Sequence, residues 1–380
     1  MRTTGAWALL TVSLVLGFLA IWVVTPAPVS ALLPFGVAVP ELSPALGAIA
    51  VILATIAWFA RARRPARAAA GIAVAAALLF AVPLAQLPST IRRFDAAMTA
   101  AGFDARLTFL NLTFIPAPGP SAVRRGVNVD ATRTTPLVAD IYARQGVRDA
   151  PLLVQLYGGA WQRGAPGDDE LFARHFAALG YVVAAIDYRH APAARWPAQI
   201  DDVRASLAWL RAHARELGAD PARLVLVGRS AGAQLALVAA YQDGAPAVAG
   251  VVSLYGPVFL ADGWREPPHP DPLGVRSILE TYLGGTPDDV PDRYEAASPV
   301  SYLTSHAPPT LLVYGTRDHI VDVRFARRLE ARLHAAGVRA ALLEIPWAEH
   351  AFDVLPHGLS ARLARFYTER FLAAVVGPVH

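Results

Sequence analysis

The chain of 380 residues contains no cysteine, and all 34 of its basic residues are arginine. Without cysteine it forms no disulfide, holds no metal through thiolates and has no thiol nucleophile. Its ten histidines are scattered, and no His-Glu-x-x-His motif occurs. A phosphate-binding loop and a dinucleotide fingerprint are also missing. These absences predict a protein that works without a metal or any other cofactor.

Charged residues make up only 17% of the chain, and they are unevenly distributed. Residues 1–100 hold seven arginines and two acidic residues, whereas residues 101–380 hold 27 arginines and 28 acidic residues. The larger part is therefore nearly neutral and lacks the basic surface that nucleic-acid binding requires. We expect no nucleic-acid partner, and the composition indicates no particular oligomeric state.

Three apolar runs without a charged residue lie at 5–24, 44–60 and 68–87. A helix of about 20 residues is roughly 30 Å long, which matches the hydrocarbon core of a bilayer. Three such runs so close together favour transmembrane helices over a buried helical hairpin. We therefore predict a multi-pass membrane region in residues 1–100, including a juxtamembrane linker, followed by a catalytic domain in residues 101–380.

The loop between the second and third runs carries four arginines, Arg61, Arg63, Arg64 and Arg67. Such loops stay in the cytoplasm, so the third helix leads outward and the catalytic domain is predicted on the extracytoplasmic side of the cell membrane. The first run also resembles a signal peptide with a small-residue cleavage site at residues 29–31. Its length of 20 residues favours a retained helix instead.

Apolar strand-like runs alternate with amphipathic helical segments throughout the larger part of the chain. This alternation predicts an α/β fold with a mostly parallel sheet covered by helices on both faces. Ligand sites in such sheets lie at the carboxyl ends of the strands. We expect strands at 137–142, 152–156, 181–186, 223–228, 248–254, 310–314 and 340–345, and helices at 168–179, 199–217, 231–241, 322–336 and 358–376.

The pentapeptide Gly228-Arg-Ser-Ala-Gly232 lies between the strand at 223–228 and the helix at 231–241. Two glycines allow a sharp, strained turn that presents the Ser230 hydroxyl at the end of a strand and the head of a helix. A small-residue turn without chemistry is the alternative, but the strand–turn–helix context favours a nucleophile at Ser230.

A serine nucleophile needs a base, and the base needs an orienting acid. Asp318 follows the strand at 310–314, and His350 follows the strand at 340–345. The order serine, aspartate, histidine along the chain is that of an α/β-hydrolase triad. Asp322 and Asp353 are rival acids that are less well placed after a strand, and Asp318 alone is also a candidate helix N-cap.

Acyl transfer also needs N–H donors for the oxygen that becomes negative. The backbone N–H of Ala231, directly after the nucleophile, is one candidate. The turn Tyr157-Gly158-Gly159-Ala160-Trp161 follows an early strand and is the expected source of the others. Trp161 and Trp347 flank the predicted site and are candidate walls of the substrate pocket, together with Tyr157.

Residues 123–376 resemble the α/β-hydrolase superfamily, most of all the carboxylesterases related to hormone-sensitive lipase and to feruloyl esterases. The resemblance rests on the turn at 157–161, on Asp187-Tyr-Arg-His-Ala-Pro192, on the pentapeptide at 228–232, and on Gly315-Thr-Arg-Asp318 with His350-Ala-Phe-Asp353. It implies a Ser230, His350 and Asp318 triad, oxyanion N–H groups at Gly159, Ala160 and Ala231, and a turn allowed by Gly158. Tyr157 departs from the family, which usually has histidine there.

Residues 256–309 are rich in proline and aromatic residues and are expected to form a short lid over the pocket. The combined features predict a membrane-anchored serine carboxylesterase, lipase-like, that acts on small-molecule or lipid-like esters. A serine peptidase or amidase on the same fold is less favoured, because Ala233 stands where exopeptidases often have glycine. An acyltransferase and a non-catalytic membrane-tethered binding module are the remaining alternatives.

Overall fold

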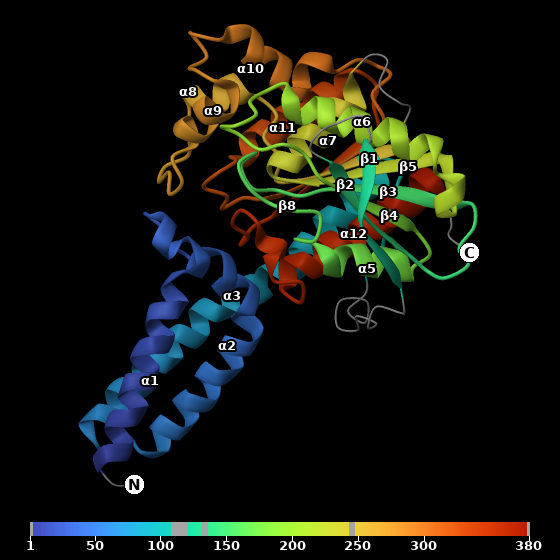
Figure 1. Ribbon diagram of the computed structural model, residues 1–380. Helices are drawn as coiled ribbons and strands as arrows, with labels where there is room; N and C mark the ends of the chain where they lie inside the picture. Colours follow the sequence, from blue (N-terminus) through green and yellow to red (C-terminus); the bar gives the residue numbers. More distant parts are fainter. Residues whose placement is uncertain (1–2, 108–120, 131–135, 243–247, 378–380) are drawn as a thin grey trace.

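The structure is a computed structural model that describes residues 3–107, 121–130, 136–242 and 248–377 (Figure 1). A bundle of three long helices projects from an α/β domain. The bundle consists of α1 (Thr3–Ile21), α2 (Leu33–Phe59) and α3 (Arg64–Ala100), with a short turn of 3-10 helix, η1 (Ser30–Leu32), before α2.

The α/β domain is built on a single sheet of eight strands in the order β1-β2-β4-β3-β5-β6-β7-β8. Strand β2 is antiparallel to both neighbours, and all other pairs are parallel, as the sequence predicted. The strands are β1 (Ala122–Asp130), β2 (Leu137–Ala143), β3 (Ala150–Leu156), β4 (Val182–Ile186), β5 (Ala219–Arg229), β6 (Gly250–Leu254), β7 (Thr310–Gly315) and β8 (Ala340–Ile345).

Among the described strands, β1 is the one that the sequence did not predict. Its residues include Arg124, Arg125 and Gly126, and most of its side chains are exposed or only half-buried. Antiparallel edge strands need no continuous apolar run, because one face and one edge remain in water. The interior strands β3, β4 and β6 are buried throughout, so their apolar runs are easy to recognise.

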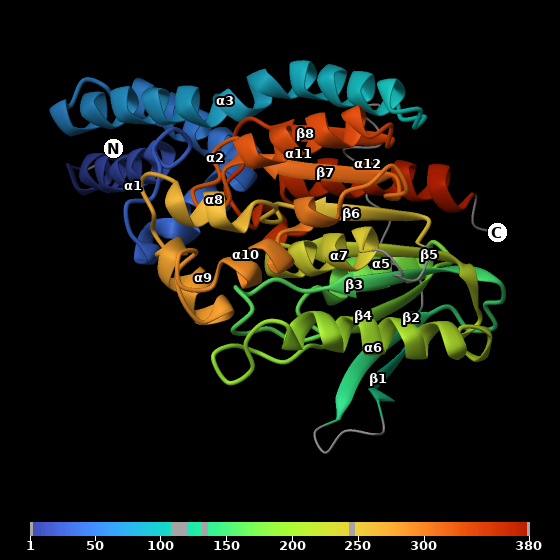
Figure 2. The same cartoon turned by 90° about the horizontal axis from the view of Figure 1, so that it is seen from above.

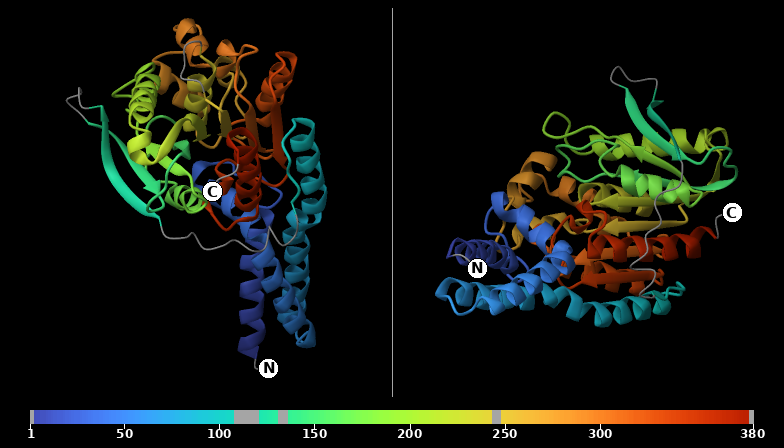
Figure 3. Two further views of the ribbon diagram at one scale, coloured as in Figure 1. Left: turned by 90° about the vertical axis from the view of Figure 1, so that its right-hand side faces the viewer. Right: turned by 90° about the horizontal axis from the view of Figure 1, so that it is seen from below.

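Helices cover both faces of the sheet (Figures 1 and 3). One face carries α6 (Ala198–Ala212), α7 (Ala231–Tyr241) and α11 (Val323–Ala335), and the other carries α5 (Glu170–Ala178) and α12 (Leu359–Val376). The helix expected at 199–217 ends earlier, with a separate turn η2 (Arg215–Leu217) before Gly218, whose φ is 83°. Between β6 and β7 lie α8 (Leu260–Arg265), α9 (Val275–Leu283), α10 (Pro291–Ala297) and η3 (Pro299–Tyr302).

Helices α2 and α3 extend beyond the apolar runs that predicted them. Helix α2 begins eleven residues earlier than the expected residue 44 and contains Pro40 and Pro44. Helix α3 continues through Pro83 and Pro88 to Ala100, so the juxtamembrane stretch is its last part and not a separate linker. The apolar runs were defined by the absence of charge, but both helices continue past charged residues, Glu41 in α2 and Arg92 in α3.

The carboxyl-terminal part of α3 packs along the edge strand β8 (Figure 2). Tyr367 of α12 donates to Asp95 at 2.8 Å, and its ring meets Phe94 edge to face. Arg339 donates to the backbone oxygens of Ala101 and Gly102 at the end of α3. The helix bundle is therefore joined to the α/β domain by packed and hydrogen-bonded contacts as well as by the chain itself.

A buried carboxyl on α2 forms a second connection. Glu41 is 3% exposed and accepts hydrogen bonds from the backbone N–H of Ser360 at 2.7 Å and from the Ser360 hydroxyl. Ser360 lies in the first turn of α12, where N–H groups have no acceptor within the helix. A side chain at Gly358 would lie within 2.6 Å of the Glu41 carboxyl, so this close approach requires glycine.

We expect Glu41→Ala to lower the free energy of unfolding by about 1–3 kcal/mol, because it leaves buried donors of Ser360 unpaired. Glu41→Gln keeps one acceptor oxygen, so its free energy of unfolding should fall less than that of Glu41→Ala. Thermal unfolding of detergent-solubilised protein measures the difference, with Leu42→Ala, on the exposed side of the same helix, as the control. Equal melting temperatures for Glu41→Ala and Leu42→Ala would contradict a stabilising role for this contact.

Candidate active site

Ser230 occupies the sharp turn between β5 and α7. Its backbone has φ 50° and ψ −120°, a conformation that residues with a side chain rarely adopt. The flanking glycines are required by close packing. A side chain at Gly228 would lie 2.5 Å from the Ala233 nitrogen, and one at Gly232 would lie 2.2 Å from the Tyr157 oxygen. The pentapeptide therefore forms the strained strand-to-helix turn typical of a nucleophile elbow.

Three residues far apart in the sequence meet at this turn. The His350 Nε2 lies 2.9 Å from the Ser230 Oγ, and the His350 Nδ1 lies 2.8 Å from the Asp318 Oδ2. The His350 side chain is nearly buried, and the Tyr255 ring packs against it at 4.7 Å between centroids. An imidazole held in this way donates from Nδ1 to the carboxylate and leaves Nε2 free to accept the serine proton.

Asp318 is oriented by backbone donors as well as by His350. Its Oδ1 accepts from the N–H groups of Ile320 and Val321 at 2.8 and 2.7 Å. Burial raises the pKa of Asp318 above its ordinary value, while the interaction with His350 and the hydrogen bond from the Val321 N–H oppose that shift. Asp322, one of the rival acids, instead caps α11 by accepting from the Arg324 N–H at 2.9 Å.

The glycine-rich turn after β3 lies directly against the elbow. A side chain at Gly158 would be 3.2 Å from the Arg229 oxygen and from the Ser230 Cβ. Gly159, Ala160 and Trp161 all have positive φ, so this turn is held in an unusual conformation. Ala231 begins α7, and N–H groups in the first turn of a helix have no intrahelical acceptor. The glycine-rich turn and the start of α7 thus both lie next to Ser230.

Tyr157 braces this turn and does not line the cavity described below. Its hydroxyl contacts the Asp187 carboxylate and the His190 Nε2, the latter at 2.9 Å. Its ring stacks on Tyr188, whose hydroxyl donates to the Tyr157 backbone oxygen at 3.0 Å. Burial raises the pKa of Tyr157 well above its ordinary value, so the phenol stays protonated and donates.

We expect Tyr157→Phe to lower kcat about tenfold with little change in KM. One buried hydrogen bond contributes about 0.5–1.5 kcal/mol, and the turn it steadies carries candidate oxyanion donors. Steady-state kinetics on a short-chain ester measure the effect. Tyr157→His, the residue usual in the family, should retain more activity than the phenylalanine variant. A rise in KM at unchanged kcat would instead assign Tyr157 to substrate binding.

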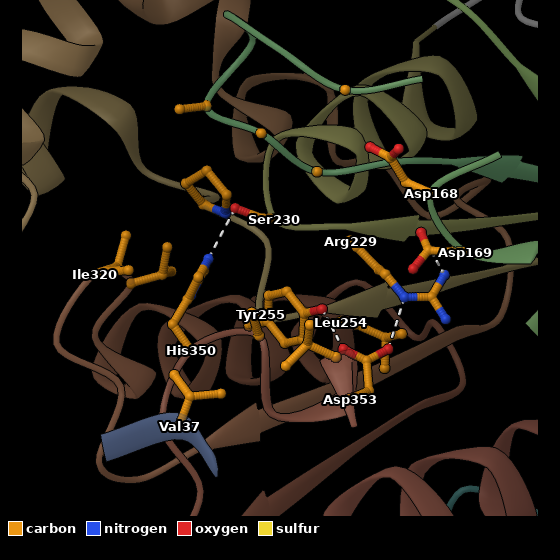
Figure 4. Close-up of a pocket in the computed structure, with 18 of the residues that line it drawn as sticks. Val37, Asp168, Asp169, Arg229, Ser230, Leu254, Tyr255, Ile320, His350 and Asp353 are labelled. Atoms are coloured by element: carbon orange, nitrogen blue, oxygen red, sulfur yellow. Dashed lines mark hydrogen bonds and ion pairs between the residues drawn. The ribbon is translucent and has the colours of Figure 1, made fainter. Parts of the chain in front are cut away.

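A cavity of about 880 Å³ opens above Ser230 and His350 (Figure 4). Trp161 lines it, stacks on Tyr282 of α9 at 4.0 Å and donates to Gln234 at 2.9 Å. Trp347 lies elsewhere: its buried ring donates to the Ser360 hydroxyl at 2.9 Å. The structure thus corrects two pocket expectations, since Tyr157 and Trp347 are not among the described residues that line this cavity.

Sequence reasoning missed a cluster of charges beside Ser230. Arg229 is buried next to Ser230 and pairs with Asp353 at 2.6 Å and with Asp169 at 3.3 Å (Figure 4). Burial acts to lower the pKa of Arg229, but the charges of Asp169 and Asp353 outweigh it and raise the pKa. Burial raises the pKa of Asp169 to about 6. The only sequence feature that pointed to this cluster was the charged Arg229 inside an otherwise small-residue pentapeptide.

Asp353 joins this cluster to the segment that carries His350. It pairs with Arg229 and also accepts from the Tyr255 hydroxyl, and the Tyr255 ring packs on His350. Asp353 therefore steadies the loop after β8. Among the described residues, no group of three or more histidine, aspartate or glutamate side chains is placed to hold a metal ion.

Comparisons with known proteins identify the class of protein to which this fold and site belong. The BD-FAE family model matches residues 139–333. The chain is 31% identical over 358 residues to the probable carboxylic ester hydrolase LipM of Mycobacterium tuberculosis, covering 84% of this chain and 81% of LipM. It is 34% identical over 233 residues to esterase LipC of the same organism, covering 57% of each.

Solved structures agree with these relatives. Esterase LipW from Mycobacterium marinum is 27% identical, with a TM-score of 0.56 over 77% of this chain and 89% of LipW. Thermogutta terrifontis esterase 2, in a structure phosphonylated by sarin, shares the fold at 22% identity and a TM-score of 0.58, covering 72% of this chain and all of the esterase. The chain belongs to the BD-FAE family of α/β-hydrolases. It is a carboxylic ester hydrolase, which confirms the predicted fold and enzyme class.

Proposed function

We propose that this protein is a membrane-anchored serine carboxylesterase whose catalytic residues are Ser230, His350 and Asp318. The observation that carries the proposal is the continuous hydrogen-bonded path from the Ser230 hydroxyl through His350 to Asp318. It lies at the floor of an apolar cavity large enough for an ester, since ligand pockets commonly measure about 300–1,000 Å³.

The reaction follows from this geometry. His350 Nε2 removes the proton as the Ser230 Oγ attacks the ester carbonyl, and Asp318 stabilises the imidazolium that forms. The carbonyl oxygen becomes negative and is held by the N–H groups of Gly159, Ala160 and Ala231. His350 then gives its proton to the departing alcohol, leaving an acyl-enzyme. Water, activated by the same imidazole, releases the carboxylic acid and restores the serine.

Membrane anchoring is supported by the surface of the helix bundle. Three helices, spanning 4–21, 30–59 and 64–100, are long and apolar enough to cross a bilayer. Among the described residues, eighteen of the 22 large apolar side chains that are exposed belong to residues 1–100. A concentration of exposed apolar side chains of this kind is costly in water and is typical of a membrane interface.

The arrangement of the bundle supports an extracytoplasmic catalytic domain. The start of α1 and the arginine-rich loop between α2 and α3 lie at the same end of the bundle, away from the catalytic domain (Figure 1). Arginine-rich loops stay in the cytoplasm. The catalytic domain at the opposite end then lies outside. This topology treats the first apolar run as a retained helix.

Hydrolysis of p-nitrophenyl esters from acetate to palmitate by the detergent-solubilised chain tests the proposed activity. We expect turnover with water as the acyl acceptor, and faster loss of ester on adding an alcohol would favour an acyltransferase. Amide analogues should react far more slowly, because the relatives are esterases. If no ester of the series reacts, the proposed activity is wrong.

Reporter fusions test the topology separately. A reporter that is active only in the cytoplasm should give a signal when fused after residue 64 and none when fused after residue 100. A cytoplasmic signal from the second fusion would refute the extracytoplasmic assignment and leave the proposed chemistry untouched.

A further inference from the structure

One stripe of helix α2 faces the catalytic domain. Leu33, Val37 and Glu41 are four residues apart, so they lie on the same side of the helix. Leu33 and Val37 line the cavity that contains Ser230, and Glu41 binds the first turn of α12. Figure 4 shows Val37 close to His350. A helix suited to crossing a bilayer therefore supplies part of the wall of the proposed active site.

The exposed residues that line the cavity include three large apolar side chains besides the charged Arg163 and Asp168. Outside the helix bundle, the described residues include only four large apolar side chains that are exposed. Three of these, Leu171, Leu273 and Val354, line this cavity. Val354 is 64% exposed and belongs to η4 (Phe352–Val354), which packs against α2. Exposed apolar side chains thus gather at the cavity and next to the membrane-suited helix.

We propose that the cavity receives the long acyl chain of a membrane-resident lipid ester, which enters from the bilayer beside α2 and lies against Leu33 and Val37. The inference rests on the proposed function and specifies its substrate class. An acyl chain that moves from the bilayer along an apolar helix into an apolar cavity avoids exposure to water, which is the costly step for long chains. The Glu41–Ser360 contact holds α2 in this position.

The absence of cysteine gives a direct test that does not depend on turnover. Val37→Cys introduces the only thiol in the chain, and its reaction with a maleimide can be followed by mass. The protein is first treated with a p-nitrophenyl alkylphosphonate. The Ser230 oxygen bonds to phosphorus, p-nitrophenolate leaves, and the serine proton passes to His350. The alkyl group then occupies the path of an acyl chain.

We expect a hexadecyl phosphonate to slow maleimide labelling of Val37→Cys at least tenfold, and a methyl phosphonate to slow it less than twofold. Leu179→Cys, which is exposed on the α/β domain and does not line the cavity, is the matched control and should label equally in all states. Equal labelling of Val37→Cys with both phosphonates would overturn the inference. No phosphonate adduct on Ser230 would refute the proposed nucleophile, and the inference with it.

The chain-length preference of a variant tests whether α2 forms this wall of the cavity. Val37→Trp should lower the ratio of kcat/KM for palmitate to that for butyrate about tenfold, because the larger ring occupies the path of a long chain. Ile52→Trp should leave the ratio unchanged. Measurable butyrate hydrolysis shows that Val37→Trp is folded. An unchanged ratio in Val37→Trp would contradict contact between α2 and the acyl chain.

Vesicles distinguish entry from the bilayer and entry from water. The wild-type protein is reconstituted into phosphatidylcholine vesicles, and a fluorogenic long-chain ester is placed either in the same vesicles or in a separate population. We expect hydrolysis at least tenfold faster when enzyme and ester share a bilayer. Equal rates would show that the ester arrives through water and would overturn the proposed route.

Discussion

Ser230→Ala should lower kcat for a short-chain ester by about 10⁶-fold, the loss seen when the nucleophile of a serine triad is removed. The Ser230 Oγ lies 2.9 Å from the His350 Nε2, which is its proposed base. Among the described residues, it is the hydroxyl that is hydrogen-bonded to His350, which in turn contacts Asp318. Removing the hydroxyl leaves only the oxyanion donors and substrate binding to favour the reaction. Initial rates with p-nitrophenyl butyrate at high enzyme concentration measure the residual activity.

The variant must be shown to fold, since Ser230 lies in a strained turn. Alanine carries the same Cβ, so φ of 50° costs the chain no more than in the wild type. An unchanged melting temperature provides the control, and a mock purification from cells without the chain gives the background rate. Retention of a tenth of the activity or more would show that another residue is the nucleophile.

The sequence predicted the meeting of Ser230, Asp318 and His350 because parallel strands fix where their loops lie. Strands β5 and β7 are interior, and the edge strand β8 is covered by α3. Their apolar runs therefore mark the ends of these strands in the sequence. Each of the three residues comes shortly after such an end, at the same edge of one sheet. The local pattern and the topology together determine their proximity.

Contacts across the two parts of the molecule could not be predicted in this way. Glu41 and Ser360 are 319 residues apart, and neither lies in a motif. The apolar character of α2 indicated a membrane helix. Because its apolar residues show no helical periodicity, the sequence did not predict which side of α2 faces the catalytic domain. The role of Leu33 and Val37 as cavity walls therefore emerges only from three-dimensional packing.

Tryptophan was a poor guide to the pocket for a related reason. Trp161 and Trp347 both follow strands whose loops carry site residues, yet only Trp161 reaches the cavity. Trp347 points into the core and donates to Ser360, which in turn donates to Glu41. Position at a strand end places a backbone segment near the site, but the side-chain direction depends on packing.

The charge cluster of Arg229, Asp169 and Asp353 lies beside Ser230 and His350. A buried arginine is tolerated only when acids compensate it, and breaking a buried pair costs about 3–5 kcal/mol. Arg229 precedes Ser230, the proposed nucleophile, and its partner Asp353 lies three residues after His350, the proposed base. The ion pair therefore ties together the two loops whose separation sets the Ser230–His350 distance.

Asp318→Asn should lower kcat by about 10⁴-fold while leaving the melting temperature nearly unchanged. The amide keeps the shape of the carboxyl, but its NH₂ group donates to His350 Nδ1. The remaining imidazole proton then resides on Nε2, which faces the Ser230 hydroxyl at 2.9 Å and no longer accepts its proton. The loss appears in kcat, because the carboxylate acts on the imidazolium that forms during the reaction.

Asp322→Asn is the matched control, because Asp322 is the nearby acid that sequence reasoning weighed as a rival. Asparagine is as good a helix cap as aspartate, so α11 should keep its first turn. Its activity should stay within about tenfold of the wild type, since its carboxyl accepts from the Arg324 N–H and not from His350. A loss confined to Asp322→Asn, or shared equally by both variants, would assign the orienting acid differently.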